Sequence, residues 1–186
     1  MTSPIFEVCL DSVASAIIAE STGAKRVELC AGLMEGGITP SAGLISTVKA
    51  KTSLPVMVMI RPRGGDFCYD DDEFAAMLED IELCKQKKVE GVVFGVLLPD
   101  GSVDKVRVKR LVETSHPMQG ITERNVQKIV SAMNATEVHV GAGGTMPSRM
   151  EYRNPYCSMG YAIAGPEYEL RLTSNRKLGG MIDRFD

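Results

Sequence analysis

The sequence lacks several features that would place the protein in a membrane or in a disulfide-rich secreted class. It has no apolar stretch of 18 residues, so we expect no transmembrane helix. Its first ten residues contain neither a basic region nor a long apolar region, so we expect no signal peptide. The five cysteines are odd in number and form no Cys-x-x-Cys pair, which favours a reducing compartment. We therefore expect a cytoplasmic protein, with the nucleus as an alternative location.

An excess of charge of one sign is also missing. The formal net charge is −3, so we expect neither nucleic acid nor an anionic membrane surface as a partner. Apolar residues make up 44% and charged residues 24% of the chain, which is ordinary for a globular protein. A chain of 186 residues has room for a single domain with a sizeable core.

Short apolar runs alternate with longer helical patterns over residues 1–113 and predict four β/α units. The predicted strands cover residues 5–10, 26–30, 56–61 and 91–97, and the predicted helices cover residues 12–21, 41–51, 71–88 and 103–113. This alternation is typical of a parallel α/β fold. The glycine-rich fingerprint of doubly wound dinucleotide-binding sheets is missing after the first strand, so we predict a TIM (β/α)8-type barrel.

The alternation breaks after residue 113. A second helix is predicted at residues 122–133, and only a short connection without a strand separates it from the fourth helix. A strand at residues 136–141 follows, and the tail over 143–186 is predicted to be irregular except for a short strand at 168–172. A complete barrel takes about 250 residues. We therefore predict an incomplete barrel of about five strands out of eight, with an internal deletion near 114–120 and a final helix–strand unit at 121–142.

Five parallel strands cannot close a barrel of ordinary tilt and shear. We therefore expect open edges at the fourth and last strands, where unpaired backbone groups favour association with other chains. The sequence thus predicts either lower stability than that of an intact relative or pairing of edges in a homo-oligomer.

Polar side chains interrupt one face of the predicted strands. Residues two apart in a strand share a face, so Glu7 lies beside Cys9 and Glu28 beside Cys30. Sites of (β/α)8 barrels lie at the C-terminal ends of the strands. One cavity is therefore predicted to collect the following side chains: Glu7, Cys9, Glu28, Cys30, Arg61, Arg63 and His139.

These side chains support two functional interpretations, beside an ion-pair layer that simply fills the barrel. In the first, Arg61 and Arg63 pair with Glu7 and Glu28 and, with the amides of the next two residues, hold a phosphate or carboxylate. The anion-binding residues are then Arg61, Arg63, Gly64 and Gly65, and the candidate catalytic residues are Glu7, Glu28 and His139. In the second, Cys9 and Cys30 occupy like positions on adjacent strands and bind Cu(I), for which thiolates are suitable ligands.

Several segments resemble the CutC family of copper homeostasis proteins. They include FEVCLDS, KRVELCAGLMEGGITPSAG and VMIRPRGGDFCY in the first half, and GITERNVQKI and ATEVHVGA further on. The resemblance covers nearly the whole chain. It implies a cytosolic TIM-barrel protein that is linked to copper tolerance, binds Cu(I) and often forms homo-oligomers, without an established catalytic activity.

The chain departs from the family at the point where the alternation breaks. A family segment with a central histidine and about three strands is absent before Gly120, and the C-terminal residues do not resemble the usual final helix of the family. The sequence therefore resembles a splice variant or a truncated form. An inactive shortened variant that acts only through partners is a third functional hypothesis, beside copper binding and an enzyme for a small anionic substrate.

Overall fold

The computed structural model describes residues 5–121, 137–141, 143–147 and 169–182. The strands are β1 Ile5–Leu10, β2 Arg26–Leu29, β3 Val56–Met59, β4 Gly91–Val93, β5 Gln119–Ile121, β6 Glu137–Val140, β7 Gly143–Pro147 and β8 Glu169–Thr173. The helices are α1 Val13–Ser21, α2 Ala42–Lys51, α3 Asp71–Gln86, α4 Lys105–Ser115, α6 Asn175–Ile182 and the short 3-10 helix η1 Leu33–Glu35. Among the described residues, no helix combines the length and the hydropathy needed to cross a bilayer.

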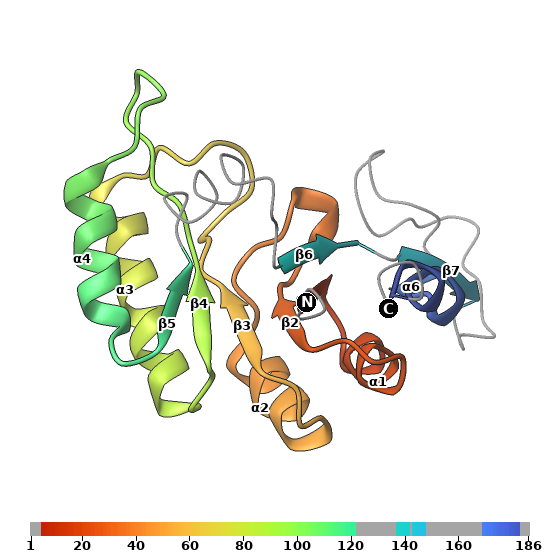
Figure 1. Ribbon diagram of the computed structural model, residues 1–186. Helices are drawn as coiled ribbons and strands as arrows, with labels where there is room; N and C mark the ends of the chain where they lie inside the picture. The colour runs from red at the N-terminus through yellow and green to blue at the C-terminus, as the bar shows by residue number, and fades with distance from the viewer. Residues whose placement is uncertain (1–4, 122–136, 142, 148–168, 183–186) are drawn as a thin grey trace, which may run out of the picture.

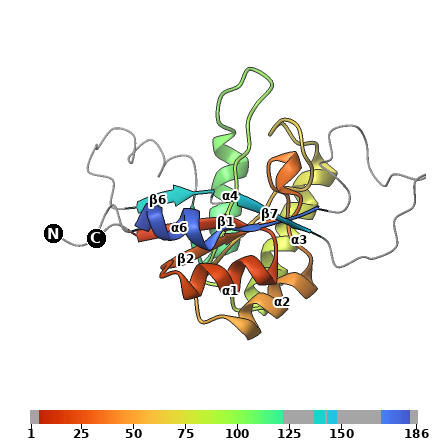
Figure 2. The same cartoon turned by 90° about the vertical axis from the view of Figure 1, so that its right-hand side faces the viewer.

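The first six strands form one parallel sheet in the order β5-β4-β3-β2-β1-β6, and β7 pairs with β8 in a separate antiparallel sheet. Helices α1 to α4 lie on one side of the six-stranded sheet (Figures 1 and 2). Phe6, Val8 and Leu10 of β1 are buried in the same core as Ile45 of α2 and Ile81 of α3. Because successive strand residues point to opposite faces, the residues between these core positions face away from the helices.

The parallel α/β fold is confirmed, but the expectation of about five strands was too low. Gln119–Ile121 pairs with Gly91–Val93 as β5, in the connection where no strand was predicted. Three residues that include a glycine show no apolar alternation, so only their pairing with β4 identifies them as a strand. The edges of the sheet are β5 and β6. The predicted open edge at the last strand, 136–141, is therefore confirmed as β6, whereas the predicted edge at the fourth strand was wrong, because β5 pairs with it. Within the described ranges no strand links these two edges, so the barrel is not complete.

The C-terminal tail is more regular than predicted. The short strand expected at 168–172 is found as β8, but β7 and α6 were not predicted. Both β8 and α6 contact α1, and the backbone N–H of Thr173 donates to the hydroxyl oxygen of Ser15 at 2.9 Å. Two glycines weaken the helical pattern of α6, which is held instead by burial of Leu178. The helix predicted at 122–133 lies outside the described residues, and the internal deletion stays a prediction.

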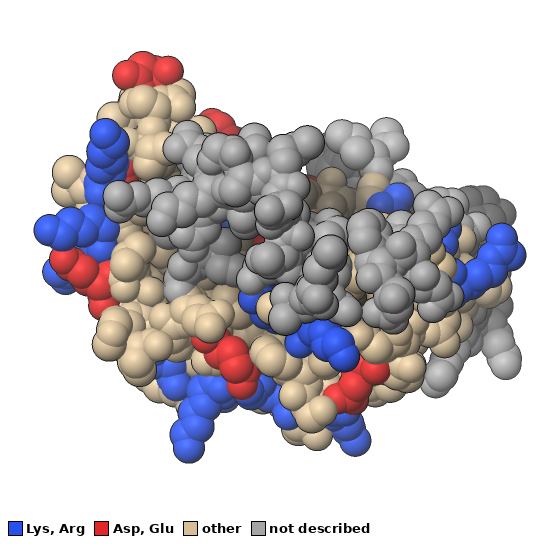
Figure 3. Space-filling model, viewed as in Figure 1, with Lys and Arg blue, Asp and Glu red and all other residues tan. Residues whose placement is uncertain are grey.

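Acidic and basic side chains are interspersed on the described part of the surface drawn in Figure 3. Several of them form ion pairs between neighbouring elements, as Lys49 of α2 does with Glu90 and Arg107 of α4 does with Asp71. Such exposed pairs contribute little to stability. The interspersed charges are in keeping with the small net charge of the sequence.

The N-terminus of α3 carries a reciprocal capping box. The backbone N–H of Glu73 donates to the carboxylate of Asp70 at 2.8 Å, and the N–H of Asp70 donates to the carboxylate of Glu73 at 3.0 Å. This pair satisfies two N–H groups that have no partner within the helix.

We expect Asp70→Ala to lower the free energy of unfolding by about 1 kcal/mol, because the N–H of Glu73 loses its acceptor. Urea denaturation measures the change. Glu79→Ala, at an exposed position of the same helix, is the control and should leave stability nearly unchanged. An equal loss in both variants would show that the capping box does not stabilise α3.

Candidate metal site

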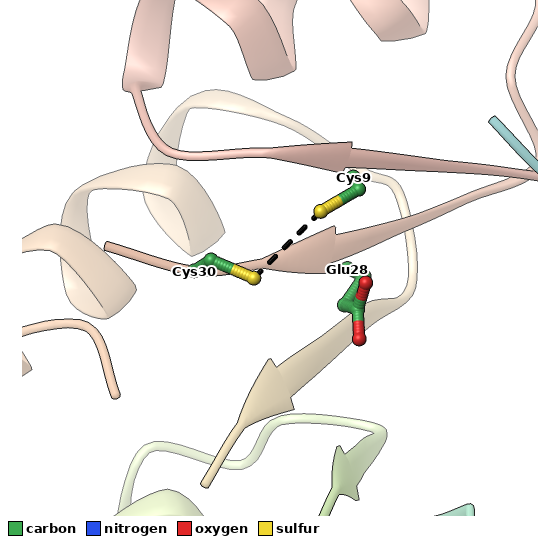
Figure 4. A group of neighbouring side chains, drawn as sticks. All are labelled: Cys9, Glu28 and Cys30. Atoms are coloured by element: carbon green, nitrogen blue, oxygen red, sulfur yellow. Dashed lines mark hydrogen bonds between the residues drawn. The ribbon is translucent and has the colours of Figure 1, made fainter. Parts of the chain in front are cut away.

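Pairing of β1 with β2 brings three potential metal ligands together. Cys9 lies opposite Glu28 in the strand register, and Cys30 follows Glu28 by two residues, which places it on the same face. The backbone N–H of Cys30 donates to Leu10 at 2.9 Å, so the pairing continues past the end of β2. The two sulfur atoms lie 3.8 Å apart (Figure 4). One carboxylate oxygen of Glu28 lies within 4.8 Å of both sulfur atoms.

The two cysteines are brought together and Glu28 lies beside them, as the sequence predicts, but Glu28 was not predicted as a metal ligand. Glu28 was considered as a catalytic residue and as a partner of Arg61 and Arg63, whereas its carboxylate lies within reach of an ion between the two thiols. The available signal was the Glu-x-Cys spacing, which puts both side chains on one face of the strand. This is the only group of three such donors among the residues that the structure describes.

The three side chains differ in their exposure. Cys30 and Glu28 are buried, with 0% and 5% of their surface exposed, whereas Cys9 is half-buried. The two cysteines form no disulfide with each other, since their sulfur atoms lie 3.8 Å apart and a disulfide needs about 2.05 Å. The site is therefore closed around Cys30 and more open at Cys9.

The donor set fits a soft or borderline metal ion. Two sulfur atoms 3.8 Å apart can each lie about 2.3 Å from a single ion between them, the usual zinc–thiolate distance. Thiolates favour Cu(I) and Zn²⁺, while a carboxylate oxygen is a harder ligand. Bound metal would be held by Cys9 and Cys30, with Glu28 as the third group within reach.

The loop after β2 folds over the Cys30 thiol. Ala31 and Ile38 form an antiparallel bridge that closes this loop. Gly37 has a positive φ of 85°, and a Cβ atom on it would lie 3.1 Å from the sulfur of Cys30. Glycine is needed here both for the backbone conformation and for this close approach.

Arg61 holds this loop in place. Its Nη1 donates to the carbonyl oxygens of Glu35 and Gly37 at 3.0 Å each, and its Nη2 donates to that of Gly65 at 2.7 Å. The guanidinium carbon lies 4.8 Å from the ring centroid of Phe67. Arg61 therefore joins the loop over Cys30 to the loop that follows β3, from a position that is only 6% exposed.

Arg63 binds the start of α3. Its guanidinium pairs with the carboxylates of Glu73 and Asp66 and donates to the carbonyl oxygens of Gly64 and Cys68. These two carboxylates raise the pKa of Arg63. The pKa of Asp66 is lowered, first by the backbone N–H of Cys68 and then by Arg63. The hydrogen bonds of Arg63 are therefore made to its own loop and to the helix after it.

The predicted pairing of Arg61 and Arg63 with Glu7 and Glu28 was wrong. Glu7 is buried and forms an ion pair with Arg26 of the adjacent strand. The two arginines lie in the loop after β3 and donate to backbone carbonyl groups of that loop. Arg26 was not predicted as a partner, although it begins the second predicted strand.

The remaining candidate residues are placed as follows. His139 of β6 lies opposite Glu7 in the strand register, but its side chain lies outside the described part of the structure. Cys84 is buried in α3, where burial, and then the charge of Asp80, raises the pKa of its thiol to about 12. Cys84 is therefore a core side chain. Cys157 lies outside the described residues.

Comparisons with a family profile and with curated proteins all find similarity to the CutC family. The profile of the CutC family matches residues 4–143. The human copper homeostasis protein cutC homolog is 36% identical over 235 residues, which cover 94% of this chain and 86% of the relative. A CutC family protein of Parabacteroides distasonis is 36% identical over 240 residues, covering 96% of this chain and 99% of the relative. Both matches extend over more residues than this chain has, so the relatives contain residues without a counterpart here.

The fold is similar to that of a solved family member. The crystal structure of a copper homeostasis protein CutC from Streptococcus agalactiae superposes with a TM-score of 0.61 and 26% sequence identity. The superposition covers 69% of this chain and 68% of the other. The shared part is thus a large portion of both molecules.

Proposed function

The chain belongs to the CutC family, and from this premise we propose that it serves copper homeostasis by binding Cu(I) between the thiolates of Cys9 and Cys30. The observation that carries the proposal is the 3.8 Å separation of the two sulfur atoms on adjacent strands. The human relative and the Streptococcus agalactiae structure carry copper homeostasis in their names. Two converging thiols are the ligands that a soft monovalent ion requires.

The surroundings of the thiols suit reversible binding. Binding deprotonates both cysteines, so it releases protons and becomes tighter as pH rises. The loop that contains Gly37 covers Cys30, while Cys9 provides the accessible side of the site. Free thiols persist in a reducing compartment, and we place the protein in the cytoplasm for this reason.

An enzyme that holds a small anion on Arg61 and Arg63 has less support. The Nη atoms of Arg61 donate to three backbone carbonyl groups, and Arg63 is paired with two carboxylates. Guanidinium groups with these partners would have to exchange them for an anion. The two sulfur atoms already lie at a separation that a shared ion can bridge, and copper binding is therefore the better-supported function.

Titration with Cu(I) in the presence of a chromogenic Cu(I) chelator, without oxygen, tests this function. We expect the wild-type chain to take one Cu(I) from the chelator and the double variant Cys9→Ser, Cys30→Ser to take none at that site. Cys68→Ser is the matched control, because Cys68 lies in a loop outside the cluster. Unchanged copper stoichiometry in the double variant would remove Cys9 and Cys30 as the binding residues.

A further inference from the structure

We infer that Glu28 determines which metal ion the thiol pair prefers: its carboxylate strengthens binding of a divalent ion such as Zn²⁺ and weakens binding of Cu(I). This inference rests on the proposed function in so far as both use Cys9 and Cys30. It adds a second class of metal ion to the site and assigns to Glu28 the choice between the two classes.

The position of Glu28 is fixed by the sheet. Strand β2 is paired on both sides, with Glu28 opposite Cys9 of β1 and opposite Met57 of β3. Glu28 is only 5% exposed, and one of its carboxylate oxygen atoms lies within 4.8 Å of the sulfur atoms of Cys9 and Cys30. An ion held by both sulfur atoms is therefore close to this oxygen, whatever the identity of the ion.

The charges at the site distinguish the two kinds of ion. A pair of thiolates with Cu(I) between them carries one net negative charge, which repels the ionised carboxylate. The same pair with Zn²⁺ between them is neutral, so the positive ion can take the carboxylate as a third ligand. Because the group is buried, solvent screens this difference less than it would at the surface.

The chemistry of the donor atoms acts in the same direction. Carboxylate oxygen is an ordinary ligand of Zn²⁺, which is commonly bound by a mixed set of sulfur, nitrogen and oxygen atoms. Cu(I) selects thiolate and thioether sulfur and gains little from a carboxylate oxygen. Charge and donor type therefore both predict that Glu28 favours the divalent ion.

The test compares Zn²⁺ and Cu(I) binding by the wild-type chain and by Glu28→Gln, each metal ion being titrated alone against a chelator. Glu28→Gln keeps the shape of the side chain and removes its charge. We expect the affinity for Zn²⁺ to fall roughly tenfold or more, while the affinity for Cu(I) rises because the repulsion between the carboxylate and the anionic Cu(I)–dithiolate group is removed. Glu79→Gln is the matched control at an exposed position and should change neither affinity.

A second variant keeps the test decisive if Glu28→Gln does not fold. Glu28→Asp retains the charge but shortens the side chain, so Zn²⁺ affinity should fall while Cu(I) affinity is retained. An equal loss of both ions in the variant that folds, or no change in either, overturns the inference. A wild-type chain that binds Zn²⁺ but not Cu(I) would instead overturn the proposed function and leave the role of Glu28 to be decided by the zinc titration.

Discussion

Replacing Arg61 with leucine is expected to lower the free energy of unfolding by about 3 kcal/mol or more, and to expose the Cys30 thiol to reagents in solution. The guanidinium donates to the carbonyl oxygens of Glu35, Gly37 and Gly65. Leucine fills part of the same volume but donates no hydrogen bond. The bond to Gly37 is buried, and a buried carbonyl group left without a donor costs about 1–3 kcal/mol, whereas each of the half-buried bonds to Glu35 and Gly65 contributes about 1 kcal/mol. The loop over Cys30 then loses the contact that holds it in place.

Two measurements distinguish the loss of overall stability in Arg61→Leu from the displacement of the loop over Cys30. Urea denaturation gives the loss of unfolding free energy, and mass spectrometry after thiol labelling gives the rate at which Cys30 reacts. In Arg61→Lys, Cys30 should react with the label nearly as fast as in Arg61→Leu. A lysine ammonium group cannot replace a planar guanidinium group that donates to three carbonyl groups at once. Arg110→Leu, at an exposed position of α4, should change neither quantity. Slow labelling of Cys30 in Arg61→Leu would show that Arg61 does not position the loop.

Gly91→Ala is expected to destabilise the protein by about 3 kcal/mol, at the upper end of the usual range for overpacking. A Cβ atom on Gly91 would lie 2.1 Å from Cε of Met57 and 2.6 Å from the backbone oxygen of Gln119. The methionine side chain can move, but the carbonyl group belongs to β5. Relief of the clash therefore separates β5 from β4 at the edge of the sheet.

A glycine in a different environment provides the control for this prediction. A Cβ atom on Gly43 of α2 would have only Ser41 within 4 Å, at 3.9 Å, so Gly43→Ala should stabilise the chain by up to about 1 kcal/mol. Thermal denaturation of the two variants should therefore shift the midpoint in opposite directions. A midpoint for Gly91→Ala equal to that of the wild type would contradict the close packing of β4 against β5.

Strands β1 to β4 and helices α1 to α4 could be predicted from sequence because each carries its own local signal. Strand β1 is mostly apolar and is followed by Ser12, the N-cap of α1, and α3 begins with the capping box of Asp70 and Glu73. By contrast, β5 and β7 exist through pairing with a partner strand. Their glycines and proline resemble a turn, so nothing in their own residues identifies them as strands.

The candidate site was also predictable only where the residues of each strand carry a local signal. Strand periodicity puts Cys9 and Cys30 on one face, and the register of parallel strands then brings them together. The partners of Arg61 were not predictable, because they are backbone carbonyl groups of loops. Every residue carries a carbonyl group, so a sequence contains no mark of which of them accepts a hydrogen bond from an arginine.

For an ion bound as proposed, the unequal burial of the two cysteines would give ion transfer a fixed order. Cys30 is enclosed beneath Gly37, whereas Cys9 is partly open to solvent. A thiolate from an acceptor must reach the ion before a bond to the protein breaks, and access controls that approach. The incoming sulfur therefore replaces Cys9 first, and the ion stays attached to Cys30 until the second replacement. Loading follows the reverse order, so the half-buried sulfur is the entry and exit point of the site.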